Sequence, residues 1–246
     1  MYTLAELDLV RIWESGTRQH LLDRALTVLM ATFPGTSRDS LALLSIGQRD
    51  ACLLVVRQQL FGPLLLGLTA CPACSEQVEF SLDVTQMPIP SNISPTHSLQ
   101  AMTIANGTIQ FRLPNSQDLA AIVSCRDTFT ARNILIQRCI VQYVQDGVVV
   151  PAENLPETLI STLAAEIERL DPLAEICINL DCSACQHSWQ MPFDIVSFFW
   201  TEISAFARRL LRDVHTLARA YGWHERDILE MGPVRRQFFL EMVTDG

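Results

Sequence analysis

The sequence lacks a run of about twenty uninterrupted apolar residues, which is the length that a membrane-spanning helix needs. Its long uncharged stretches are broken by Gly62-Pro63, by a cysteine motif at 71–74, or by the prolines at 88, 90 and 95. The chain also begins Met-Tyr-Thr-Leu-Ala, without the basic and apolar segments of a secretory signal. We therefore expect no membrane span, and we expect the reducing environment of the cytoplasm.

The signatures of common catalytic sites are also missing. There is no His-Glu-x-x-His motif, no glycine-rich phosphate loop and no serine nucleophile elbow, and the five histidines show no ligand spacing. A metal-dependent or redox enzyme would need an open coordination position or a reactive thiol in a cleft. The sequence offers little support for either, so we expect a protein that is not an enzyme.

Basic residues are scarce relative to acidic ones. The chain of 246 residues has 18 Lys plus Arg against 27 Asp plus Glu, for a formal net charge of −9. Nucleic-acid binding by a zinc ribbon normally requires a basic face, so this class of partner is disfavoured. The chain is 49% hydrophobic and only 18% charged, with a mean hydropathy of +0.21. This composition predicts a sizeable core and further apolar surface that is covered by protein partners.

Two Cys-x-x-Cys motifs, at 71–74 and 182–185, stand out against this background. The stretches that follow are similar: each has an apolar residue, Glu or Gln, further alternating apolar positions and an Asp. Alternation with period two after a Cys-x-x-Cys turn is typical of a knuckle that leads into a β-strand. Each motif therefore predicts one half of a zinc ribbon.

Four thiolates suit one zinc ion in tetrahedral coordination, which leaves no open position for substrate or water. The sequence therefore predicts one structural Zn²⁺ per chain, bound by Cys71, Cys74, Cys182 and Cys185. Zinc-finger peptides gain roughly 10–16 kcal/mol of apparent folding free energy from their metal. A single ion here would hold together two distant segments of the chain.

Other roles for the cysteines are disulfides and thioredoxin-like redox chemistry. Disulfides require an oxidising compartment, and a redox Cys-x-x-Cys opens a helix rather than a strand. His187 could replace a ligand, but with four cysteines available we expect it beside the site. The other four cysteines lie in apolar runs and are expected to be buried small hydrophobes: Cys52, Cys125, Cys139 and Cys177.

The periodicity predicts an α+β fold, a mainly helical chain around a split four-cysteine, zinc-ribbon-like β module. The expected helices are 21–33, 48–60, 116–124, 130–141 and 157–170, and the expected strands before the motifs are 63–68 and 174–180. A proline-rich linker over 85–95 precedes a hairpin at 103–113, whose turn is Asn106-Gly107.

Four segments follow from these elements. Residues 1–84 hold the N-terminal helices and the first ribbon half, and 85–156 form an inserted hairpin and helical segment. Residues 157–195 supply a helix, a strand and the second ribbon half. Residues 196–246 form a C-terminal region with one long helix and two short ones, at 224–230 and 233–243.

The long C-terminal helix carries one apolar stripe, expected to be core, from Ile195 through Ile203 and Leu210 to Tyr221. Arginines on its other faces are either a solvated surface or a salt-bridging contact with an acidic neighbour. The candidate partner-binding residues of this region are Trp200, Arg208, Arg209, Arg212, Arg235 and Arg236.

Motifs along nearly the whole chain resemble those of one family. Besides the two cysteine motifs they are 60–62 (Leu-Phe-Gly), 78–80 (Val-Glu-Phe), 170–175 (Leu-Asp-Pro-Leu-Ala-Glu), 192–195 (Pro-Phe-Asp-Ile), 211–215 (Leu-Arg-x-Val-His), 221–229 (Tyr-Gly-Trp-His-Glu-Arg-Asp-Ile-Leu) and 233–236 (Pro-x-Arg-Arg). The chain resembles the T-even-phage-type baseplate proteins of contractile phage tails and extracellular contractile injection systems.

This resemblance implies a structural component of a baseplate or hub, with other baseplate, hub or tail-tube proteins as partners and no catalytic residues. A chaperone that assists hub assembly and leaves before completion is the alternative. In both cases we expect the protein to act in the cytoplasm, within or during assembly of a contractile tail-like particle.

Overall fold

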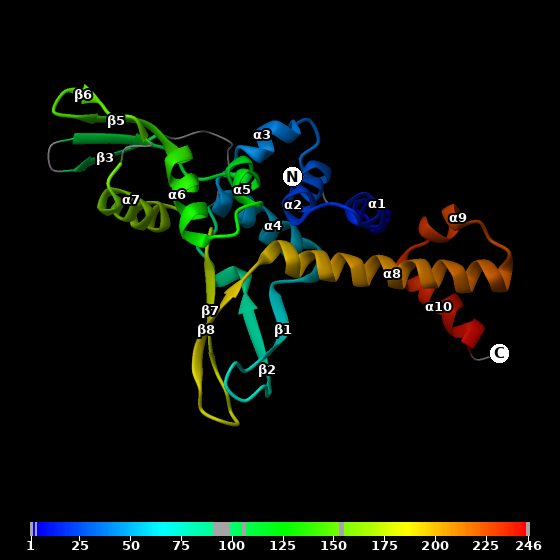
Figure 1. The fold of residues 1–246 in the computed structure, drawn as a ribbon. Coiled ribbons are helices and arrows are strands. Elements are labelled where there is room, and N and C mark those ends of the chain that lie inside the picture. The colour runs from blue at the N-terminus through cyan, green and yellow to red at the C-terminus, as the bar shows by residue number, and fades with distance from the viewer. Residues whose placement is uncertain (1, 3, 91–98, 105–106, 153–154, 245–246) are drawn as a thin grey trace. The chain divides into compact units, whose positions relative to one another are not determined.

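A computed structural model describes residues 2, 4–90, 99–104, 107–152 and 155–244 (Figure 1). The chain divides into two compact units, one formed by Met1–Pro34 with Val196–Gly246 and the other by Gly35–Ile195. Helices and small antiparallel sheets are interspersed along the chain, and no parallel strand pair occurs among the described residues, so the predicted α+β class is confirmed. Within the described residues, no helix is both long enough and apolar enough to cross a membrane.

The first unit is helical. Most of the apolar stripe of its longest helix is confirmed as core, since Phe199, Ile203, Leu210 and Leu217 are buried, but Tyr221 at its end is exposed. Side chains from the other helices of this unit pack against that stripe in two clusters. The helices are α1 (Glu6–Gly16), α2 (Leu21–Thr32), α8 (Ile195–Tyr221), α9 (Glu225–Leu229) and α10 (Pro233–Thr244).

The second unit begins with α3 (Arg38–Ala42) and α4 (Ile46–Phe61). At the start of α4, the Ser45 hydroxyl accepts a hydrogen bond from the Gln48 backbone N–H, and the Gln48 side chain accepts one from the Ser45 backbone N–H. This reciprocal capping satisfies two backbone donors that would otherwise lack partners. Gly62, with φ of +87°, ends the helix.

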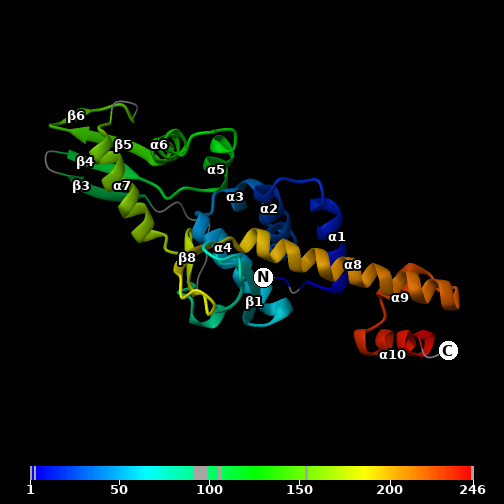
Figure 2. The ribbon, with the colours of Figure 1, turned by 60° about the horizontal axis from the view of Figure 1, so that its bottom comes forward.

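Two β-hairpins follow the same design in this unit. The first consists of β1 (Leu64–Ala70) and β2 (Gln77–Asp83), and the second of β7 (Ile176–Asp181) and β8 (Ser188–Phe193). They lie side by side, with β2 against β7 (Figures 1 and 2). Phe80 meets Phe193 edge to face, with ring centroids 6.4 Å apart. The hairpins therefore share an aromatic contact in addition to their cysteines.

Gly67 explains how Phe80 fits on the first hairpin. It pairs directly with Phe80 across the strands, and a Cβ at Gly67 would overlap the phenylalanine ring. The glycine thus makes room for the large ring over β1. Arg57 fixes the approach to this strand, because its guanidinium donates to the carbonyl groups of Gly62 and Leu64.

The segment between the hairpins contains a separate four-stranded sheet, in the order β3-β4-β5-β6. Its strands are β3 (Gln100–Ile104), β4 (Gly107–Phe111), β5 (Ile140–Gln145) and β6 (Val148–Val149), and its helices are α5 (Ser116–Ile122), α6 (Thr128–Cys139) and α7 (Glu157–Leu170). The sheet, α6 and α7 bury one cluster that includes Ile109, Phe111, Ile136, Tyr143 and Leu163. The two strands of the predicted hairpin are confirmed, whereas Asn106 in its turn lies outside the described residues.

The structure corrects several sequence-based boundaries. Helix α5, expected over 116–124, ends at Ile122, and the Asn115 side chain before its first residue accepts from two backbone N–H groups. The helix expected over 130–141 ends at Cys139, because β-branched Ile140 and Val141 continue as strand β5. The start of the 85–95 linker is a short 3₁₀ turn, η1 (Val84–Gln86), and Pro95 lies outside the described residues.

Candidate metal centre

The first cysteine motif forms a tight turn between β1 and β2. The Ser75 backbone N–H donates to the Cys71 carbonyl at 2.8 Å, and the Cys71 N–H donates to the Glu76 carbonyl at 2.8 Å. Ser75 has φ of +63°, in the left-handed region that non-glycine residues seldom adopt. The reversal of the backbone at Ser75 closes the turn between the two cysteines and the second strand.

The second motif repeats this turn between β7 and β8. The Gln186 N–H donates to the Cys182 carbonyl at 2.9 Å, and the Cys182 N–H donates to the His187 carbonyl at 2.9 Å. Gln186 has φ of +60° and follows its second cysteine as Ser75 follows Cys74. The two motifs are therefore the same structural unit used twice.

The two turns bring four sulfur atoms together. The Sγ atoms of Cys71 and Cys185 are 3.7 Å apart, those of Cys74 and Cys182 are 3.6 Å apart, and all four lie within 4.8 Å of one another. A zinc ion with Zn–S bonds of about 2.3 Å in a tetrahedron requires sulfurs about 3.8 Å apart. The spacing therefore fits a metal ion, and it is far longer than the ~2.05 Å bond of a disulfide.

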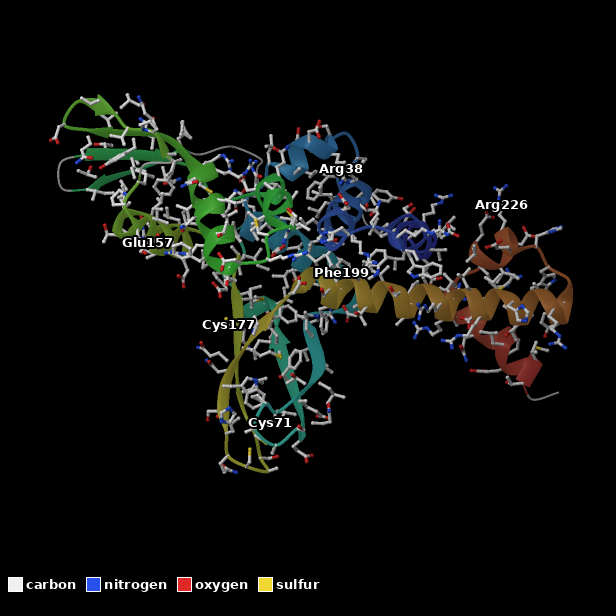
Figure 3. All side chains as sticks on the ribbon, viewed as in Figure 1. Arg38, Cys71, Glu157, Cys177, Phe199 and Arg226 are labelled. Atoms are coloured by element: carbon white, nitrogen blue, oxygen red, sulfur yellow. The ribbon has the colours of Figure 1, made fainter. Side chains whose placement is uncertain are left out.

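Burial divides the four cysteines into two pairs. Cys71 and Cys182, the first of each motif, are buried, whereas Cys74 and Cys185 are exposed. Figure 3 shows Cys71 towards the turn end of the hairpins. A metal ion at this position would be covered by protein on one side only. The arrangement indicates a metal crosslink between the two hairpins, close to their turns.

Hydrogen bonds favour a thiolate at Cys71. Burial raises the pKa of its thiol, but backbone N–H groups of Ala73 and Cys74 donate to the sulfur and lower the pKa to about 7. At Cys74 the Glu76 backbone N–H lowers the pKa, yet the neighbouring thiols of Cys185, Cys182 and Cys71, with burial, raise it to about 12. Four negative sulfurs at this spacing repel one another, so full deprotonation needs a bound cation.

His187 lies beside the sulfur cluster, as predicted. Its ring stacks on that of Trp189, with centroids 5.9 Å apart, and only the four cysteines form the cluster among the described residues. The expectation of buried cysteines elsewhere is correct for Cys52 and Cys139, only partly met by Cys125, which is half-buried, and wrong for Cys177, which is exposed. Strand alternation explains the error, because Cys177 falls on the outward face of β7 (Figure 3).

The candidate partner-binding residues differ in what they contact. Trp200 lies over Gly16, with the Arg24 guanidinium 4.5 Å from its ring centre. Arg236 is buried and its guanidinium lies 2.7 Å from a carboxylate oxygen of Glu6. These two side chains therefore make contacts within their own unit. The exposed candidates are Arg208, Arg209, Arg212 and Arg235.

Sequence reasoning missed the left-handed residues of the two turns. Neither Ser75 nor Gln186 is a glycine or asparagine, so the residue types give no indication of positive φ. Their equivalent places in the two repeats are the signal that could have identified them. Both follow the second cysteine of a motif, where the chain must reverse before entering the strand.

Comparisons with known proteins identify the family. A family model described as T4 bacteriophage base plate protein matches residues 2–200, which include both cysteine motifs. No curated protein and no solved structure matches the chain. The motifs at 211–215, 221–229 and 233–236 lie beyond the matched region. Because the match covers most of the sequence, the chain belongs to the T4 bacteriophage base plate protein family.

Proposed function

We propose that this chain is a non-enzymatic structural component of the baseplate or hub of a contractile phage-like tail or injection system. One structural zinc ion, bound by Cys71, Cys74, Cys182 and Cys185, fastens its two hairpins. The single observation that carries the proposal is the sulfur cluster, in which cysteines 108 and 114 residues apart in the family region come together. Such a crosslink stabilises a fixed shape, which is what a baseplate subunit requires.

The chemistry of the cluster supports a structural role for the metal. Four thiolates complete a tetrahedral zinc shell, so no position remains for a water or a substrate. In the part of the chain that the structure describes, no His, Asp or Glu joins the four cysteines to enlarge the site. We also propose that the protein assembles in the cytoplasm, because a cluster of four thiols requires a reducing compartment.

Exposed cations on the C-terminal helices suit contacts with acidic neighbours in the baseplate, the hub or the tail tube. Arg208 and Arg212 lie one helical turn apart on α8, and both are exposed. Neither forms an ion pair with a carboxylate among the residues that the structure describes. The net charge of −9 disfavours nucleic acid as the partner.

Quantitative mass spectrometry of purified particles and of partially assembled hubs tests the proposal. We expect this chain in finished particles at a fixed ratio to the other baseplate proteins. A variant with Cys74→Ser and Cys185→Ser should be depleted from particles, while Cys177→Ser, a control that keeps all four ligands, should be incorporated normally. Presence in partial hubs with absence from finished particles would identify an assembly chaperone and overturn the structural role.

A further inference from the structure

The two hairpins differ on their outward faces. On β1, Leu64, Leu66 and Leu68 are 51%, 69% and 65% exposed. When the cysteine motifs are superposed, the equivalent positions of the second hairpin are Glu175, Cys177 and Asn179, which are also exposed. Because one hairpin is built with polar residues at these positions, the leucines are not needed to form the hairpin. We call Leu64, Leu66 and Leu68 the leucine face; its exposure indicates a surface that another protein covers.

Acidic residues border the leucine face on one side only. Directly across the strands, Glu79 lies opposite Leu68 and Asp83 lies opposite Leu64. Strand β1 itself carries no charge, its other edge has no strand partner in the described part of the chain, and no Lys or Arg occurs over 64–83. Asp83 already binds Thr85, whereas Glu79 is exposed and has no cation within ion-pair distance among the described residues. A matching surface must therefore be apolar with a cation on one border.

Helix α10 of the same chain provides such a surface. Val234, Phe238 and Met242 are 85%, 59% and 53% exposed and recur every four residues, so they form one stripe along the helix. We call them the α10 stripe. Arg235 borders it, exposed, with its guanidinium 5.8 Å from the Phe239 ring centre. In the described part of the chain no carboxylate pairs with Arg235.

The two surfaces also match in length. The eight helical steps from Val234 to Met242 span about 12 Å at 1.5 Å per residue. The four strand steps from Leu64 to Leu68 span about 14 Å at 3.4 Å per residue. Val234 and Phe238 also line a groove of about 650 Å³ together with Phe206 of α8, and charged side chains such as Arg209 and Glu241 complete its lining.

We propose that the α10 stripe of one copy of this chain lies across the leucine face of a second copy. Val234 then meets Leu68, Met242 meets Leu64, and Arg235 pairs with Glu79. Pairing of the leucine face with itself is disfavoured, because it would bring the acidic borders of two copies together. The proposed contact joins two different surfaces, so it is head-to-tail. A row of copies therefore always has one free leucine face at one end and one free α10 stripe at the other. It does not depend on the identity of the metal or on the chain's place in a particle.

Sedimentation velocity of the purified full chain over a range of concentrations tests this contact. We expect the wild-type chain to self-associate. Leu66→Asn with Leu68→Asn should weaken association at least about tenfold, and so should Val234→Asn with Phe238→Ser. Val149→Asn, which changes an exposed apolar residue outside both surfaces, is the matched control and should leave association unchanged. Each variant should keep the metal content and urea unfolding midpoint of the wild type, which separates lost association from lost folding.

Mixing the leucine-face variant with the α10 variant gives the decisive result. The leucine-face variant retains an intact α10 stripe, and the α10 variant retains an intact leucine face. Together they should form a one-to-one complex and nothing larger. Charge reversal at Glu79→Arg or Arg235→Glu should weaken association, and the chain with both changes should recover it. A wild-type monomer at all concentrations, no complex in the mixture, or no recovery in the double reversal would overturn the proposal.

Discussion

The backbone N–H of Gly47 donates a hydrogen bond of 3.0 Å to the side-chain carboxylate of Asp171, which lies 124 residues further along the chain. Gly47 is in the first turn of α4, so this carboxylate faces the positive end of the helix dipole. Burial raises the pKa of Asp171, while the hydrogen bonds from Gly47 and Ser45 act in the opposite direction. The contact connects the start of α4 to the segment that leads into the second hairpin.

Gly47→Ala should destabilise the protein, because a Cβ at this position would overlap the Asp171 carboxylate. Displacing a buried carboxylate from its donor costs about 1–3 kcal/mol of the free energy of unfolding, measurable by urea denaturation. Gly232→Ala is the matched control, since a Cβ there meets nothing within 4 Å. If Gly47→Ala remains equally destabilising in an Asp171→Ala background, the two residues are not coupled and this explanation fails.

Asp118 should be a stabilising carboxylate whose contribution depends on pH. Its buried side chain accepts hydrogen bonds of 2.9 Å from both Arg112 and Arg138. Burial raises the pKa of Asp118, but these arginines and the Asn115 N–H outweigh burial and lower it below 3.8. A lowered folded pKa means that the stabilisation is present above pH 3.8 and is lost as the pH falls through the folded value.

Asp118→Asn should therefore lower the free energy of unfolding by about 3 kcal/mol at neutral pH, the low end for a broken buried pair because both arginines are partly exposed. The difference between wild type and variant should shrink in acid, as measured by urea unfolding at several pH values. Arg132→Gln, which removes an exposed pair with Glu157, is the control and should have little effect. If the difference in unfolding free energy between wild type and Asp118→Asn stays constant or widens in acid, the lowered pKa of Asp118 is contradicted.

The left-handed turns should tolerate glycine and reject β-branched residues. Ser75→Gly and Gln186→Gly keep the required positive φ without a Cβ, so metal affinity should be unchanged or slightly higher. Ser75→Val should weaken metal binding by roughly tenfold, since a left-handed β-branched residue is strained by about 1–2 kcal/mol. Competition with a chromophoric zinc chelator measures these affinities. Equal affinities for Ser75→Gly and Ser75→Val would show that the turn does not hold this conformation.

Thiol alkylation should distinguish the cysteines by environment. Burial raises the pKa of both Cys52 and Cys139 to about 12, so these thiols should resist iodoacetamide until the protein unfolds. Cys177 is exposed and should react in the folded, metal-loaded chain. Peptide mapping by mass spectrometry locates the label. Early labelling of Cys139 without labelling of Cys177 would contradict the burial pattern.

Most of the longer helices and the paired ribbon halves could be predicted because their signals are local. The α8 stripe repeats every three or four residues, and the cysteine motifs specify both a turn and a shared ligand. Strands β5 and β6 were missed because β5 follows α6 without a loop at Ile140. Helices α1 and α3 were not predicted either, and α3 is only five residues long.

Contacts between distant residues could not be predicted from one sequence. Nothing local shows that Asp171 binds the Gly47 N–H, or that Arg236 is buried beside Glu6 rather than exposed. The exposure of Leu64, Leu66 and Leu68 also depends on which face of β1 is covered in the folded chain. The division of the chain into segments 1–84, 85–156, 157–195 and 196–246 stays a prediction, which limited proteolysis would test.

Native mass spectrometry of the purified, unmodified chain tests the central claim most directly. One zinc ion shared by two hairpins predicts a mass increase of one zinc per chain that disappears on chelation or in acid. It also predicts that Cys74→Ser and Cys185→Ser lower zinc content and stability to a similar extent, because each removes one ligand from the same ion. A chain with no zinc, with two zinc ions, or with cysteines oxidised to disulfides would contradict the account.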